Sequence, residues 1–293
     1  MKIGFSGLGQ MGKPMALNLT RCCEQLLVND IIDKHFSEFE KNGVKTTLAI
    51  KDFADCDIIF LCLPHSGIVN EILFGKGELA SFLKPGQIVC DLSTSNYNDT
   101  LQIAEKLEKI GVEFMDAPVS GAEVKAIDGT LTIMCGGTQA IFDKLYPFFK
   151  CMGSNILFMG KTGAGQLTKT LNNVLYDINI AAFAEIFPLA VKLGLEAEKF
   201  GNVVNSSTGG SWASNFFVPR MLERKFAGTY PMTHAYKDLI SCAEISAQHG
   251  VPLPVTHAAT TTYQIAMLAE NEDADKGAMI KVYEKLLNVE FKK

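Results

Sequence analysis

Three glycines near the start of the chain have the spacing G-x-G-x-x-G, which is typical of a loop that holds a dinucleotide. The spacing follows a short apolar segment at residues 2–6 and precedes a helical pattern at residues 11–20. In that context the first glycine permits a tight turn, the second lets a pyrophosphate approach the backbone, and the third lets the helix pack closely on the strand. The residues predicted to bind a dinucleotide cofactor are Gly7, Leu8, Gly9, Gln10, Met11 and Gly12.

Asp30 ends a second apolar segment, residues 25–29, and stands 21 residues after Gly9. A carboxylate at this place accepts hydrogen bonds from the adenosine ribose hydroxyls and repels the 2′-phosphate of NADP. The next residue is Ile31 rather than an arginine that would hold that phosphate. The sequence therefore favours NAD, and Lys34 nearby leaves NADP open as the alternative.

Lys169 and Asn173 are polar residues in a largely apolar helical pattern at residues 166–193. Their spacing of four residues places both side chains on one face of a helix. A lysine in a cleft between two domains loses solvation, which lowers its pKa towards the working pH and suits it to acid and base catalysis. Two interpretations stay open at this point, a catalytic pair or a pair of satisfied polar residues at a domain interface.

Cysteine and histidine usage gives no sign of a metal site or of a disulfide framework. Eight cysteines are dispersed without a C-x-x-C pair, and five histidines lack the spacing of zinc ligands. Cys62 and Cys90 lie in apolar runs, which favours free, buried thiols. Free thiols and a start without a secretory signal predict a cytoplasmic protein.

The elements that must position these residues change in kind near residue 160. Strand patterns alternate with helical ones in the first half, at 2–6, 25–29, 58–63, 87–92, 113–115 and 131–135, with a helix at 99–110. Later patterns are helical, at 166–193, 197–205, 238–249, 254–269 and 275–287. We predict an α/β fold in which a doubly wound, Rossmann-type domain at 1–162 precedes an all-helical domain at 163–293. Residues 163–194 form the long connecting helix.

Composition limits the classes of function. The chain has 293 residues, 47% of them hydrophobic and 20% charged, which excludes intrinsic disorder and fibrous repeats. The net charge is −5 and no lysine or arginine cluster stands out, so we expect no nucleic-acid partner. No uninterrupted apolar run approaches the roughly 20 residues that span a bilayer, so we expect no membrane partner.

Four segments together resemble the β-hydroxyacid dehydrogenase family, and the resemblance extends over essentially the whole chain. The first is GFSGLGQMGKPMALNL at residues 4–19, and the second is DAPVSG at 116–121 with GTL at 129–131. The third is GAGQLTKTLNN at 163–173, and the fourth is KDL at 237–239. The resemblance implies an enzyme that interconverts a 3-hydroxy acid and its semialdehyde by hydride transfer.

The resemblance also implies roles for particular residues. It makes Lys169 the catalytic acid and base, with Asn173 orienting the substrate. The substrate carboxylate is held by a loop that departs from the family at one position, where an alanine replaces a second glycine and narrows the fit. The loop residues are Ser120, Gly121 and Ala122. The resemblance also implies that Leu63, Pro64 and Thr94 line the nicotinamide half of the cofactor site and that Lys237 approaches the cofactor from the helical domain.

The substrate remains open between members of this family. Residues 120–131 resemble tartronate semialdehyde (2-hydroxy-3-oxopropionate) reductases, which we favour, whereas residues 206–212 resemble enzymes for larger acids such as 2-(hydroxymethyl)glutarate. A 3-hydroxyisobutyrate dehydrogenase is a further alternative, and a catalytically silent nucleotide-binding scaffold is the non-enzyme one. Family resemblance and a long apolar helix predict a homodimer or homotetramer.

Overall fold

Contacts divide the chain into two compact units, which we call unit 1 (Met1–Lys169) and unit 2 (Thr170–Lys293). The computed structural model describes residues 1–270 and 274–293. The division falls inside a long helix, α7 (Ala164–Lys192), whereas the sequence predicts the domain boundary at the start of this helix.

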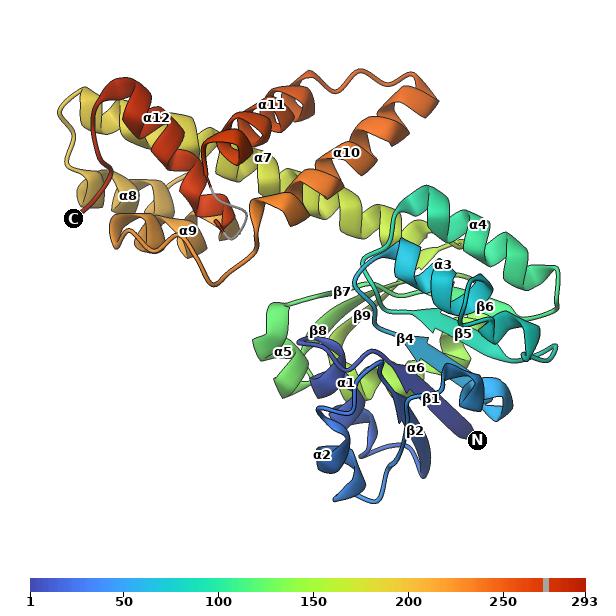
Figure 1. Cartoon of the computed structure of the whole chain (residues 1–293). Helices are drawn as coiled ribbons and strands as arrows, with labels where there is room; N and C mark the ends of the chain where they lie inside the picture. Colours follow the sequence, from blue (N-terminus) through green and yellow to red (C-terminus); the bar gives the residue numbers. More distant parts are fainter. Residues whose placement is uncertain (271–273) are drawn as a thin grey trace. The chain divides into compact units, whose positions relative to one another are not determined.

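Unit 1 is built on one sheet in which β1 lies between β2 and β4 (Figure 1). The strand order is β3-β2-β1-β4-β5-β6-β8-β7, with β9 paired to β8. Pairing is parallel from β3 to β6, and β8 runs antiparallel to β6 and β7. The strands are β1 (Lys2–Ser6), β2 (Gln25–Asn29), β3 (Lys45–Thr47), β4 (Ile58–Leu61), β5 (Ile88–Asp91), β6 (Glu113–Asp116), β7 (Val119–Ser120), β8 (Leu131–Gly136) and β9 (Gly153–Gly160).

Both faces of the sheet are buried at its centre, which explains why β4 is apolar at every position. In β4, Ile58 and Phe60 pack on one face, while Ile59 and Leu61 pack on the other. Successive side chains of a strand point to opposite faces, so a strand covered twice reads as an unbroken apolar run. One face packs against α1 (Gly12–Leu19), α2 (Phe36–Glu40), α5 (Ala122–Asp128) and α6 (Gln139–Met152). The other packs against η1 (Ile50–Asp55), α3 (Ser66–Phe74), η2 (Leu79–Ser81) and α4 (Tyr97–Glu108).

Unit 2 is helical and has its own apolar core, in which Phe187, Phe217, Tyr263 and Phe291 are fully buried. Besides most of α7, its helices are α8 (Ala197–Ser206), α9 (Trp212–Leu222), α10 (Met232–His249), α11 (Pro254–Ala269), η3 (Lys276–Met279) and α12 (Ile280–Leu287). By length and composition α7 could cross a membrane, but half of its most apolar stretch is buried in the protein. A core helix passes the same test, and we interpret α7 as one.

The predicted fold class, a doubly wound sheet followed by a helical part, is confirmed. Three strands were missed, β3, β7 and β9. The longest of them, β9, pairs through its backbone with β8 while most of its side chains are exposed, so it lacks the buried run that marks the central strands. Helices α2, α3, α5, α6 and α9 were also missed.

The sequence predicts no disulfide framework, and this expectation is wrong for one pair of cysteines. Cys22, just after α1, and Cys151, near the end of α6, form a disulfide. The two residues are 129 positions apart in sequence, so no local cysteine spacing predicts that they pair. Six other cysteines are free, and Cys62 and Cys90 are among them as predicted.

Candidate active site

The glycine-rich loop between β1 and α1 has the geometry that a dinucleotide requires. Gly7 has a φ of +97°, and a Cβ there would collide with the carbonyl oxygen of Cys62. A Cβ on Gly12 would collide with the carbonyl oxygen of Gly7. At Gly9 no atom lies within 4 Å of the position that a Cβ would occupy, so the backbone is open there. The loop is therefore tight at two glycines and accessible at the middle one, which fits the approach of a pyrophosphate.

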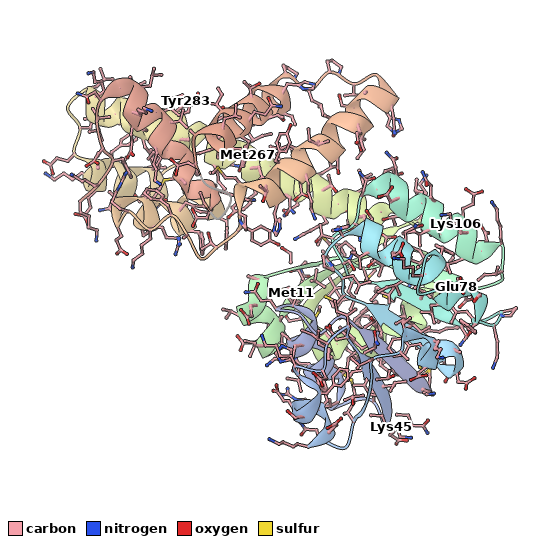
Figure 2. All side chains as sticks on the ribbon, viewed as in Figure 1. Met11, Lys45, Glu78, Lys106, Met267 and Tyr283 are labelled. Carbon is pink, nitrogen blue, oxygen red and sulfur yellow. A yellow bond between two sulfur atoms is a disulfide. The ribbon has the colours of Figure 1, made fainter. Side chains whose placement is uncertain are left out.

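Helix α1 begins directly after this loop, and its free N–H groups supply partial positive charge to bound phosphate. The N–H of Lys13 donates to the carbonyl oxygen of Gly9 at 3.0 Å, which closes the first turn. Met11, labelled in Figure 2, packs partly buried against the core of the sheet and anchors the end of the loop.

Asp30 lies at the carboxyl end of β2 and is tied to the same loop. Its Oδ2 atom accepts a hydrogen bond from the N–H of Leu8 at 2.6 Å. Ile31, the next residue, is 87% exposed and contributes no positive charge. The pair therefore presents a carboxylate and an apolar side chain beside the glycine-rich loop.

The loops after β4 and β5 are joined by hydrogen bonds. The N–H of Leu63 donates to Oγ of Ser93 at 2.8 Å. The buried Asp91 carboxylate accepts the N–H of Ser93 at 2.9 Å and Oγ of Ser95 at 2.7 Å. Burial raises the pKa of Asp91 to about 6, and these hydrogen bonds oppose the rise. The loop that carries Thr94 is thereby connected to the loop that carries Leu63 and Pro64.

The predicted carboxylate loop follows β7 and is connected to the glycine-rich loop. Ser120 ends the strand, and Gly121, with a φ of +140°, turns the chain into α5. Nε2 of Gln10 donates to Oε2 of Glu123 at 2.8 Å. The glycine-rich loop is therefore connected to the start of α5, beside the carboxylate loop, within unit 1, whereas Asn173 and Lys237 lie in unit 2.

Ala122 occupies a backbone conformation that disfavours any residue with a side chain. Its φ is +58°, in the left-handed region, where Cβ approaches the following carbonyl oxygen. The resemblance expects a glycine here, and glycine has no such penalty. The departure noticed in the sequence therefore has a conformational cost as well as a steric one.

Lys169 lies in the second turn of α7 and is 6% exposed. The first turn of that helix is held by Asp116, at the end of β6. Its two carboxylate oxygens accept the N–H of Gly163 at 2.6 Å and the N–H of Gln166 at 2.8 Å. Burial raises the pKa of Asp116 to about 7, and the two backbone N–H groups oppose the rise.

In unit 2, Asn173 is oriented by an acidic residue that the sequence reasoning did not single out. Nδ2 of Asn173 donates to Oδ2 of Asp238 at 2.7 Å, and Asp238 is buried. This bond uses the amide nitrogen of the Asn173 side chain for a contact within the protein. Lys237, predicted to approach the cofactor, precedes Asp238 in α10.

Two buried residues of unit 1 were missed as candidates, Asp116 and Gln166. Asp116 stands inside one of the four recognised segments, but its role there is visible only through its helix contacts. Gln166 is fully buried, which is unusual for an amide in an apolar helix. Its position three residues before the candidate lysine is the sequence signal that could have identified Gln166.

Family comparison covers both halves of the chain. Residues 2–160 match the family described as the NAD binding domain of 6-phosphogluconate dehydrogenase. Residues 163–283 match the family described as the NAD-binding domain of NADP-dependent 3-hydroxyisobutyrate dehydrogenase.

Individual relatives are similar over nearly their full length. A 2-(hydroxymethyl)glutarate dehydrogenase of Eubacterium barkeri is 35% identical over 291 residues, covering 99% of this chain and 97% of that protein. A 2-hydroxy-3-oxopropionate reductase of Escherichia coli is 30% identical, covering 98% of this chain and 99% of that protein. The structure of Mycobacterium tuberculosis 3-hydroxyisobutyrate dehydrogenase with L-serine is 28% identical, with a TM-score of 0.86, covering 96% and 98% of the two chains.

The strained backbone at Ala122 predicts that Ala122→Gly stabilises the protein. A left-handed alanine costs about 1–2 kcal/mol, part of which is offset because glycine gains freedom in the unfolded chain. We expect a net gain of about 0.5–1 kcal/mol in the free energy of unfolding, measured in urea. The control Ala140→Gly, at an exposed right-handed position of α6, should destabilise instead. A loss of stability in Ala122→Gly would contradict the conformational argument.

The raised pKa of Asp116 predicts a pH dependence of stability. Between its ordinary pKa near 4 and its folded pKa of about 7, the native carboxyl holds a proton that the unfolded chain has released. The contribution of Asp116 to the free energy of unfolding therefore falls as pH rises from 4 to 7, by at most about 1.4 kcal/mol per pH unit. The difference in free energy of unfolding between wild type and Asp116→Asn should decline from pH 4 to 7 and then level. A difference that grows with pH would show that the N–H donors outweigh burial.

Proposed function

This chain belongs to the β-hydroxyacid dehydrogenase family, and we propose that it interconverts a small 3-hydroxy acid and its semialdehyde with Lys169 as acid and base. It is an NAD(P)-dependent oxidoreductase. The observation that carries the proposal lies in unit 1, where hydrogen bonds join the glycine-rich loop to Asp30 and to the start of α5 beside the carboxylate loop, and join the loops after β4 and β5 to each other.

The proposed chemistry divides between binding, orientation and proton transfer. The Ser120 hydroxyl and the Gly121 N–H hold the substrate carboxylate, and Asn173 orients the substrate. Lys169 donates a proton to the developing alkoxide during reduction and removes it during oxidation. Bound NAD(P) supplies or accepts the hydride. The low exposure of Lys169 favours this role, because a site that excludes water strengthens proton transfer and electrostatic contacts.

For the substrate we favour tartronate semialdehyde, on the sequence of residues 120–131 and the 30% identity to the Escherichia coli reductase. The second candidate is a larger acid of the 2-(hydroxymethyl)glutarate type, supported by residues 206–212 and by the 35% identity to the Eubacterium enzyme. 3-Hydroxyisobutyrate is the third. Turnover of the three corresponding semialdehydes, compared by kcat/KM, distinguishes them.

NAD is the proposed cofactor because Asp30 and Ile31 present no positive charge to a 2′-phosphate. Lys237 is proposed as a further cofactor contact. We also propose a cytoplasmic homo-oligomer. Its interface would use the exposed leucines and isoleucine of α7, namely Leu171, Leu175, Ile186 and Leu189.

Replacement of the proposed acid and base should abolish most turnover. We expect Lys169→Ala to lower kcat by about 10²–10⁴-fold while the dissociation constant for NADH stays within about twofold. Steady-state kinetics with the best semialdehyde and titration of NADH fluorescence measure the two quantities. Lys192→Ala, an exposed lysine at the end of the same helix, is the matched control. Near-normal turnover in Lys169→Ala would remove the proposed mechanism.

An arginine after Asp30 should widen the cofactor preference. Because Ile31 is exposed, Ile31→Arg removes little packing and places a guanidinium where a 2′-phosphate would lie. We expect kcat/KM for NADPH to rise about tenfold, the equivalent of one charge-assisted hydrogen bond. Ile31→Met serves as the uncharged control. Equal NADPH use by wild type and both variants would argue against the proposed adenosine site.

A further inference from the structure

The side chain of Gln166 clamps the loop on both sides of Thr94. Its Oε1 atom accepts the N–H of Ser95 at 3.0 Å, and its Nε2 atom donates to the carbonyl oxygen of Ser93 at 2.7 Å. Gln166 is fully buried, so water cannot replace either bond. Thr94 is the residue proposed to line the nicotinamide, and its backbone is therefore fixed by a residue of α7.

The clamp needs a side chain in which one atom accepts a hydrogen bond while another donates one. A carboxamide does this, and an ionised carboxylate or a thioether does not. Buried backbone groups left without a partner are strongly disfavoured. The clamp therefore favours glutamine at residue 166 by its hydrogen-bonding chemistry.

The clamped loop is itself rigid. Ser93 accepts the N–H of Leu63 through its hydroxyl, and its own N–H donates to Asp91. Ser95 donates its hydroxyl to the same carboxylate. Movement of Gln166 would consequently be transmitted to the loops after β4 and β5 together.

The other end of the connection, the first turn of α7, has no room to slide. A Cβ on Gly165 would collide with the carbonyl oxygen of Met134. A Cβ on Gly136 would lie 2.6 Å from Oδ1 of Asp116 and 2.7 Å from the backbone nitrogen of Gly165. Helix and strands are thus in direct backbone contact, and Asp116 binds two N–H groups of this turn.

Lys169 follows Gln166 by three residues, which is less than one helical turn. We propose that Gln166 is a positioning residue that couples the nicotinamide-lining loop to the helix carrying Lys169. It sets where the hydride and the proton are delivered relative to one another. This inference rests on the proposed function for its catalytic consequence, whereas the coupling itself is a property of the free protein.

Gln166→Met tests the coupling, because methionine has a similar volume and lacks the amide. The matched control is Gln87→Met. Gln87 also uses its amide to join backbone segments of unit 1, donating to the carbonyl oxygens of Ala54 at 3.0 Å and Cys56 at 2.6 Å. It lies beside the start of β5, whereas the Gln166 clamp lies beyond the end of that strand.

Hydrogen exchange of the free protein gives a readout that does not depend on activity. Gln166→Met should accelerate exchange of the Ser95 N–H at least tenfold, and Gln87→Met should leave it unchanged. Unchanged Ser95 exchange in folded Gln166→Met would overturn the coupling. If that variant does not fold, Gln166→Asn keeps a carboxamide but is one methylene shorter, so it does not reach both Ser93 and Ser95. The coupling then predicts faster exchange in the 92–96 segment of Gln166→Asn, and unchanged exchange overturns it.

Kinetics separate this inference from the proposed function. We expect Gln166→Met to lose at least tenfold more kcat than Gln87→Met. KM and the NADH dissociation constant should stay within twofold, and the isotope effect with C4-deuterated NADH should rise. Equal loss of kcat in both variants would overturn the positioning role while leaving the proposed function intact. Absence of turnover in wild type would overturn the proposed function, and Ser95 exchange would still decide the coupling.

Discussion

The carboxylate of Asp116 accepts two backbone hydrogen bonds that fix the start of α7, and the arrangement of the candidate site depends on these two bonds. Helix starts leave N–H groups without intrahelical partners, and most helices satisfy them with a neighbouring residue. Here the partner comes from β6, 47 and 50 positions earlier in the chain. A helix capped in this way is attached to the sheet at its first turn, and Lys169 follows within the next turn. The close packing requires glycine at Gly136 and Gly165.

The rest of the site follows from the order of the parallel strands. β1 lies between β2 and β4, so β2 and β3 extend the sheet on one side of β1 and the later parallel strands extend it on the other. At such a reversal of strand order the loops at the carboxyl ends of the strands separate and leave a crevice. The glycine-rich loop, Asp30 and the loops after β4 and β5 all begin at those ends. Hydrogen bonds between neighbouring loops, such as Leu8 to Asp30 and Leu63 to Ser93, then set their mutual positions. Candidate binding residues that are far apart in sequence are therefore brought to the same edge of the sheet by the strands that precede them.

Features with a local cause were predictable from the sequence, and features with a distant cause were not. The glycine spacing identifies the cofactor loop because each glycine meets a local steric requirement. β4 is an unbroken apolar run because its alternate side chains are buried on opposite faces of the sheet. Gln166 has partners 71 and 73 residues away, and nothing beside it in sequence indicates them. Strand β9 and the Cys22–Cys151 disulfide were missed for the same reason, since distant pairing defines them. The strain at Ala122 needed a backbone angle that sequence alone does not supply.

Direct transfer of hydrogen from the cofactor tests the central claim, that this fold performs hydride chemistry on a semialdehyde. The protein is incubated with a semialdehyde and NADH that carries deuterium at both C4 positions, and the product is analysed by mass spectrometry and NMR. The account predicts one deuterium per product molecule, bonded to the new carbinol carbon and on a single face. Product without deuterium, or deuterium released to water, would contradict it.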